Sequence, residues 1–476
     1  MTDAKPLLAL LCLTLAACTR QAPVEPAALT PPPRWQAAVP DAAVSVRDWW
    51  RHFNDPALER LVQTARAGSH DLAAGRARLR QARAAITQAR APLLPELKAD
   101  LSANQQRLLR GPGFSQLDAS REQPRYHSFG GLLNASYELD LWGGKAAALA
   151  SAEQGYAASR FDQAALELTL ESAVASAYLS LQALAEQQRI ARHNRDNARQ
   201  VLALVQTRHA AGAAGAVELA QQQGLLAARE REHARLRQQR QEARVALAAL
   251  LGQPVQQLQV SDQGFERLAN PALDPGLPSA LLARRPDIAA AEARLAAAEA
   301  DITVARAALL PSLSLTAALG SGADQFPDLL RNPYTNLGVA LSAPIFNAGR
   351  LDAVHQQRQA RQAELLATYR GAIVNAFADV ERALLALEGS AHQQRWQAEE
   401  RDRARQAFEL AERRYRAGAE TWLTVLETQR SLFQAEDAAV QVRLAQLQAS
   451  VSLYKALGGG WQPPEGCGGI RWRRRG

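Results

Sequence analysis

The stretch QARAPLLPELKADLS, residues 88–102, decides how this chain is interpreted, because a helical pattern stops at two prolines and an alternating pattern begins. VARAALLPSLSLTAA, residues 304–318, repeats that change 216 residues later. From Asp71 to Leu97, 17 of 27 positions match the second copy without a gap. A period near 210 residues is far too long for a solenoid. The chain is therefore predicted to contain two copies of one large unit.

The composition favours long helices over thick globular cores. The length of 476 residues suggests two or three domains, but aromatic residues make up only 5% of the chain. The net charge of +8 is partly local, because four arginines lie in the last six residues. That basic end, residues 459–476, is interpreted as a solvated tail, and no nucleic-acid partner is expected.

The first residues predict export and attachment to lipid. Lys5 precedes an apolar run, residues 7–17, that has the length of a signal-peptide core and is too short to span a bilayer. The run leads into LAAC, residues 15–18, which resembles the lipobox of bacterial lipoproteins. That resemblance implies removal of residues 1–17 as a signal peptide and acylation, for example with palmitate, of the thiol of Cys18.

The residues after the lipobox predict an anchored, extended segment. Thr19 follows Cys18, and in bacterial lipoproteins a residue other than Asp at this position is associated with sorting to the outer membrane. Residues 18–50 are rich in proline and are interpreted as a lipid-anchored tether. Cys467 is then the remaining free cysteine, so no disulfide is expected within one mature chain.

Two proline-free windows, residues 125–253 and 345–462, predict unusually long helices. Each window divides at a glycine, Gly212 or Gly418, where a helical hairpin needs a left-handed residue. The predicted long arms are 145–211 and 350–417, the return arms are 217–251 and 421–457, and further helices at 57–91 and 286–308 precede the proline switches. Stacked end to end, the shorter helices nearly match the long arms, which gives a rod roughly 100 Å long.

Four alternating runs predict β-strands, at 97–103, 132–141, 313–319 and 337–345. Their length suits a membrane strand, but four strands cannot close a barrel and an open edge cannot face lipid. Several chains must then contribute strands to one barrel. The alternative is a small soluble sheet that caps a coiled coil, and the pattern alone favours neither. The lipobox favours the membrane interpretation, and so do aromatic residues near the strand ends, including Trp142 and Phe346, as an interfacial belt.

Several longer motifs then carry a resemblance to a known family. They are YELDLWGGK (137–145), the connector that runs from LPSALLARRPD to LLPSLSL (277–315), APIFNAGRL (343–351) and RYRAGAETWLTVLETQRSLFQAED (414–437). Over essentially the whole mature chain, the sequence resembles the TolC-like outer-membrane factors of tripartite efflux pumps, in their lipoprotein branch. The tail PPEGCGGIRWRRRG (463–476) and the glycine-rich first tip, HAAGAAGAVEL (209–219), depart from the family pattern.

The resemblance implies a mainly α fold with a membrane β-barrel. A homotrimer would combine a 12-stranded barrel in the outer membrane of a Gram-negative bacterium with a long periplasmic α-barrel. Its helical tips, at Gly212 and Gly418, would contact a periplasmic adaptor, and the adaptor would join it to an inner-membrane pump of the RND type. The implied function is passive export of drugs or toxic compounds to the exterior.

The resemblance also points to residues that close the tube. Leu423 and Glu427 are four residues apart on one helix face and match the family's apolar and acidic constriction. Glu218 matches an acidic residue that links neighbouring tips in relatives, but the position of its usual Arg partner holds Glu420. Without the resemblance, Leu423 is an ordinary seam residue and Glu427 a solvated helix charge.

Other function classes find less support. The eight histidines show no metal-binding spacing, and neither a nucleophile elbow nor a phosphate-binding loop is present, so no enzyme activity, metal or cofactor is expected. A periplasmic adaptor lipoprotein is the main alternative, and a lipid-anchored hydrolase the second. An adaptor needs one hairpin flanked by β-rich segments, whereas this chain has two repeats, residues 51–252 and 286–458, joined by a connector at 253–285.

Overall fold

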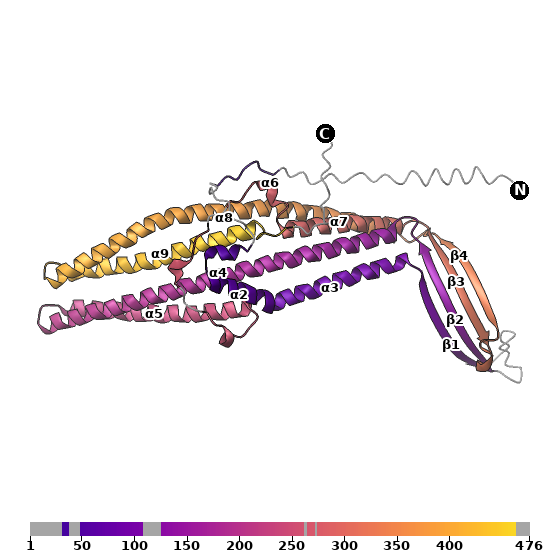
Figure 1. Ribbon diagram of the computed structural model, residues 1–476, viewed down its shortest axis with the longest axis horizontal. Coiled ribbons are helices and arrows are strands. Elements are labelled where there is room, and N and C mark those ends of the chain that lie inside the picture. The colour runs from indigo at the N-terminus through magenta and orange to yellow at the C-terminus, as the bar shows by residue number, and fades with distance from the viewer. Residues whose placement is uncertain (1–30, 38–47, 108–124, 261–263, 272–273, 463–476) are drawn as a thin grey trace.

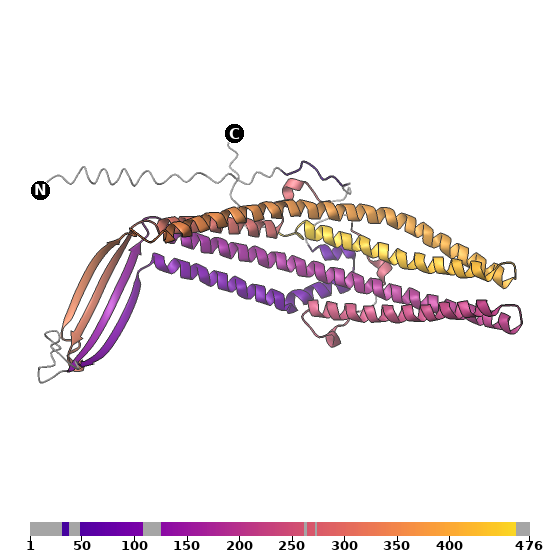
Figure 2. The same cartoon turned by 180° about the vertical axis from the view of Figure 1, so that it is seen from behind.

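A computed structural model describes residues 31–37, 48–107, 125–260, 264–271 and 274–462. Long helices lie side by side in a layer that meets a four-stranded sheet at one end and two helical tips at the other (Figure 1). The view from behind shows the same arrangement (Figure 2). The predicted signal peptide, Cys18, Cys467 and the terminal arginines lie outside the described residues.

The order of elements repeats along the chain. The first half contains η1 (Trp49–Phe53), α2 (Pro56–Gly68), α3 (His70–Arg90), η2 (Ala91–Leu93), β1 (Glu96–Arg107), β2 (Arg125–Leu139), α4 (Gly144–Ala210) and α5 (Ala216–Leu250). The connector contains η3 (Val255–Gln257), η4 (Phe265–Arg267) and α6 (Pro278–Leu281). The second half contains α7 (Pro286–Ala307), β3 (Ser312–Ala323), η5 (Phe326–Asp328), β4 (Pro333–Ser342), α8 (Arg350–Arg416) and α9 (Trp422–Ala456).

The long helices and the first strands of the two halves correspond at constant offsets. The bounds of β1 and β3 differ by 216 residues, whereas those of α4 and α8, and of α5 and α9, differ by 206. The change falls between the end of the first strand and the start of the long helix in each half, a stretch that is ten residues longer in the first half. Both long arms have 67 residues, with each bound within one residue of its prediction. Each position of one hairpin therefore has a defined counterpart in the other.

One predicted helix, 57–91, is wrong as a single element. It breaks at Ser69 into α2 and α3, because the Ser69 side chain accepts a hydrogen bond from the amide of Leu72 and caps a new helix. The break makes room for the end of α5. A Cβ on Gly252, whose φ is 71°, would lie 2.3 Å from the carbonyl oxygen of Gly68.

The second half has the same joint. A Cβ on Gly458, whose φ is 87°, would lie 2.0 Å from the carbonyl oxygen of Arg284, next to the start of α7. Shorter helices thus meet end to end beside each long arm, as predicted, although α2 turns aside and only α3 stacks on α5. Only glycine allows this approach, since a side chain would meet backbone.

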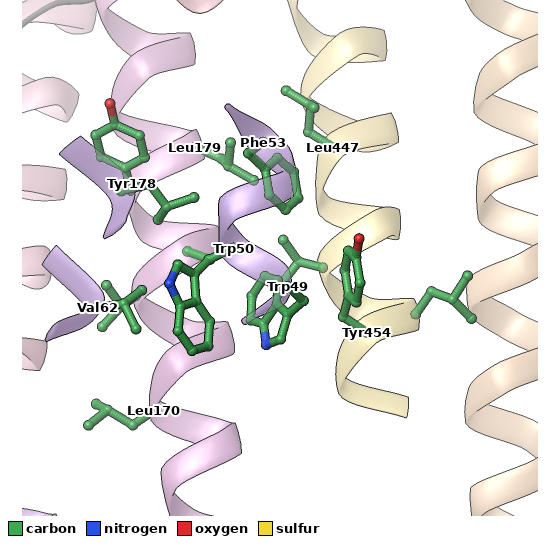
Figure 3. Packing of buried hydrophobic residues seen from close by; sticks show 14 of the residues in the cluster. Trp49, Trp50, Phe53, Val62, Leu170, Tyr178, Leu179, Leu447 and Tyr454 are labelled. Atoms are coloured by element: carbon green, nitrogen blue, oxygen red, sulfur yellow. The ribbon is translucent and has the colours of Figure 1, made fainter. Parts of the chain in front are cut away.

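The main core lies at the level of these joints. Trp49 of η1 stacks on Tyr454 of α9 at a ring distance of 5.1 Å, and both side chains are fully buried. The Tyr178 hydroxyl donates a 2.5 Å hydrogen bond to Asp55, which caps α2. Figure 3 shows these aromatic rings between α4 and α9. The short η1 helix therefore joins the two repeats.

The sheet has the order β1-β2-β3-β4 and is antiparallel throughout. Its pairing follows the repeat, because Leu97 faces Ala135 in the first half and Leu313 faces Leu341 in the second. One face is apolar and solvent-exposed in the single chain, with Leu97, Leu101, Leu133, Leu315, Leu319, Leu337, Val339 and Leu341. The other carries polar residues, including Lys98, Asn134, Ser136, Thr316 and Asn336.

Candidate functional site at the hairpin tips

The two tips have the same backbone. Gly212 and Gly418 have φ values of 73° and 75° and end the long helices. The amide of Ala213 donates to the carbonyl of Arg208 at 2.8 Å, and the amide of Ala419 donates to that of Arg414 at 2.9 Å. This is the bonding of a helix end closed by a left-handed glycine. The second glycine of the first tip, Gly215, caps α5 in an extended conformation, so it does not alter the turn.

Leu423 and Glu427 lie on the one exposed stripe of the start of α9. The Leu423 side chain is 56% exposed, and Glu427 is exposed with no ion pair among the described residues. Trp422, Val425 and Leu426 on the other side of the helix are buried. An apolar side chain and a carboxylate thus protrude together, one helical turn apart, just after the tip.

The structure does not bring Glu218 and Glu420 together. Glu420 stays within its own hairpin, where it lies 3.3 Å from the guanidinium of Arg414 and accepts hydrogen bonds from the Thr421 amide and the Thr424 hydroxyl. These contacts lower the pKa of Glu420, and the hydrogen bond from the Thr421 amide contributes most. Glu218 is half-buried and forms no ion pair among the described residues.

A contact that sequence reasoning missed joins the two tips. The guanidinium of Arg208 donates a 2.9 Å hydrogen bond to the carbonyl of Tyr415 and lies 4.4 Å from the centre of its ring. Burial, and then the carboxylate of Glu218, raise the pKa of Tyr415. Arg208 and Tyr415 therefore form a cross-hairpin contact, which we call the tip latch.

The repeat shows a signal for this contact. Arg208 is the counterpart of Arg414, and Ala214 is the counterpart of Glu420. Because the first tip has no carboxylate at residue 214, its arginine is free to reach the other hairpin. The pairing of Arg208 with Tyr415 still requires the two hairpins to be side by side, which no local pattern reveals.

A small apolar cluster lies behind the latch. Tyr415 packs on Trp422 at a ring distance of 5.6 Å. The cluster joins all four hairpin helices through Val201, Val205, Leu225, Phe408, Ala411, Leu426 and Leu432. Gln429 is fully buried beside it, and neither atom of its amide has a partner among the described residues.

The other end of the helices meets the sheet. The Trp142 indole donates a 2.6 Å hydrogen bond to the carbonyl of Pro311, which ties the end of β2 to the start of β3. Phe346 is 89% exposed beyond the end of β4. In the part of the chain that the structure describes, no helix is apolar and long enough to cross a membrane, and no cluster of His, Cys, Asp or Glu forms a metal site.

Comparison with known proteins identifies the family. The outer membrane efflux protein family matches residues 61–253 and 277–459, one stretch in each repeat. The chain belongs to this family. It is 55% identical over 454 residues to the pyoverdine export outer membrane protein OpmQ of Pseudomonas aeruginosa, which covers 95% of this chain and 96% of OpmQ. An OpmQ of Pseudomonas putida is 52% identical over the same shares of both chains.

More distant relatives agree. The toluene efflux pump outer membrane protein TtgC of Pseudomonas putida is 33% identical, over 90% of this chain and 88% of TtgC. The solved structure of the outer-membrane channel OprN is similar with a TM-score of 0.81 and 29% identity, over 90% of this chain and 98% of OprN. The chain is therefore an outer-membrane channel protein of efflux systems, and the adaptor alternative is set aside.

Proposed function

We propose that three copies of this chain form one conduit through which a pyoverdine-like siderophore leaves the cell. Their twelve strands would close a barrel in the outer membrane, and their hairpins would form a tube that extends into the periplasm. The observation that carries the assembly is the sheet, which has one apolar face and one polar face, yet its edge strands β1 and β4 have no further partner among the described residues. Lipid allows a two-faced sheet only when its edges are paired.

The helical layer supports the same assembly. It ends in α3 and α5 on one side and in α8 on the other. Val374, Leu385 and Trp396 are exposed on α8 and follow each other at intervals of eleven residues, which places them in one line. An apolar line on an edge helix needs a partner, and the edge helices of the next copy supply one.

The tips supply the gate in this proposal. Three copies of Leu423 would form an apolar ring that closes by dewetting, and three copies of Glu427 a carboxylate ring that favours cations. Gly212 and Gly418 lie in the turns that join α4 to α5 and α8 to α9, where a periplasmic adaptor would make its contact and connect the tube to an inner-membrane pump. Acylated Cys18 would hold the tether at the membrane, and Trp142 and Phe346 would lie at its interface. The RND type of the pump stays a prediction of the family resemblance.

The gate is tested by single-channel recording in planar bilayers. The purified protein should show small, cation-preferring openings, and Leu423→Ala/Glu427→Ala should show larger, less selective ones. A control change on the helical layer away from the tips, Thr368→Ala, removes an exposed hydroxyl that bonds Glu364 of the same helix, and it should leave selectivity unchanged. The gate assignment fails if the double variant and the wild type conduct alike.

The exported compound is tested by complementation. Its assignment rests on the 55% identity to OpmQ, against 33% to relatives named for toluene efflux or for antibiotic efflux. A Pseudomonas aeruginosa strain without OpmQ should regain pyoverdine in the medium when it expresses this chain, and should not when it expresses OprJ, which is 33% identical to this chain. Equal recovery with both proteins would show that the channel does not decide the substrate.

A further inference from the structure

The internal repeat assigns two further residues to the constriction at the tips. Because α5 and α9 correspond position by position, the counterpart of Leu423 is Val217, and the counterpart of Glu427 is Gln221. We propose that Val217 and Gln221 of the first hairpin line the same ring as Leu423 and Glu427. The ring would then hold six apolar side chains but only three carboxylates. This inference rests on the proposed channel and deepens its gate.

The pattern of exposure supports the correspondence. Val217 is 70% exposed and Leu423 is 56% exposed, and these are the only large apolar side chains so exposed in the described first turns of the return helices. Both lie two residues after the helix cap, Gly215 or Thr421. Gln221 and Glu427 follow one turn later, and both are exposed. The same turn geometry at Gly212 and Gly418 places both pairs at one height.

The helices that surround α5 and α9 support the correspondence between these two return helices. Within one chain α9 packs between α8 and α4, so its exposed stripe is what remains free between two neighbours. Helix α5 packs mainly on α4 and lies at the edge of the layer, with Arg229 as a further contact to the ring of Phe433 on α9. In a closed ring of three chains, α8 of the next copy would flank α5 as α4 flanks α9. Because the face of α9 that carries Leu423 and Glu427 stays exposed between its two neighbours, we expect the matching face of α5 to stay exposed in the ring.

Gln223 illustrates how the surroundings of α9 predict those of α5 in the ring. It is exposed in the single chain, but its counterpart Gln429 is fully buried against neighbouring helices. We therefore expect Gln223 to be covered by the next copy. Val217 and Gln221 have counterparts that stay exposed between two neighbours, so they stay exposed in the ring as well.

The ring also explains the charge at the constriction. A neutral amide at residue 221 spaces the carboxylates of Glu427 on alternate hairpins. Like charges placed on all six hairpins would repel each other, and the repulsion would favour opening. The first hairpin thus contributes apolar closure without adding negative charge.

The test compares Gln221→Glu with Gln206→Glu in the full-length protein in planar bilayers. Gln206 lies on α4 near the same height, and its counterpart Glu412 lines a groove between the hairpins. That groove also contains Glu436, which is nine residues from Glu427 and therefore about half a turn around α9. Both substitutions add one carboxylate per chain, but only Gln221→Glu should add it to the ring.

Gln221→Glu should raise the permeability ratio of potassium over chloride by about threefold or more, since a charge within several ångströms of the pore axis raises the local cation concentration by about that factor. Gln206→Glu should leave the ratio within error of wild type, and Val217→Ala should enlarge the openings as Leu423→Ala does. If Glu427→Gln lowers the ratio while Gln221→Glu equals Gln206→Glu, the proposed gate stands and this inference is overturned. If neither Glu427→Gln nor Gln221→Glu changes the ratio, both are overturned.

Discussion

Removal of the Arg208 guanidinium should favour the open tube. In the tip latch this group donates a 2.9 Å hydrogen bond to the Tyr415 carbonyl and lies 4.4 Å from the centre of its ring. A hydrogen bond from a charged donor contributes about 1.5–3 kcal/mol, and a partly exposed cation–π contact about 0.5–1 kcal/mol. Water compensates part of this sum when Arg208 is released, so we expect about 2 kcal/mol for each latch. The closed-to-open ratio should then fall roughly thirtyfold for each latch that is lost.

The assay is the open fraction of Arg208→Ala in planar bilayers, beside Arg416→Ala. Arg416 is a matched control, because its side chain is 58% exposed and its ion pair among the described residues is with Glu412 on its own helix. We expect Arg208→Ala to be open for most of the recording and Arg416→Ala to resemble wild type. Equal open fractions for the two variants would refute the latch, because a general loss of positive charge at the tips would then explain both.

Three other changes test the joints, the core and the sheet. Gly458→Ala should lower the urea midpoint, because the left-handed backbone and the close carbonyl of Arg284 should reduce the free energy of unfolding by about 3 kcal/mol. Its control, Gly389→Ala, should raise the midpoint slightly, because nothing lies within 4 Å of the added Cβ. Burial raises the pKa of Glu171 to about 7, although the contact with Arg66 opposes this shift. The folded state therefore holds the proton more tightly than the unfolded state, and the free energy of unfolding should fall as the pH rises from about 4.5 to 7. Glu171→Gln should flatten that fall in denaturation measured across this range. On β4, Leu337→Arg should reduce folding into lipid vesicles by about 2–4 kcal/mol, while its neighbour Asn336→Arg, on the polar face, should fold as wild type does.

The sequence predicts those features that depend on spacing along the chain. Helix and strand periods differ, so the switch at Pro95 and Pro311 is visible in the local pattern, and glycine is needed where a helix reverses, as at Gly212 and Gly418. The placement of Leu423 and Glu427 on one face follows from a separation of four residues. All of these are local consequences of backbone geometry.

Tertiary structure decides the features that depend on residues far apart in the chain. The break at Ser69 exists because the end of α5 arrives there, 183 residues later at Gly252. Arg208 reaches Tyr415, 207 residues away, because the two hairpins lie side by side. Glu420 is held by Arg414 within its own tip, although the sequence alone leaves its partner open. Periodicity fixes each element and its faces, but the contacts between elements follow from packing, which joins residues that no local pattern relates.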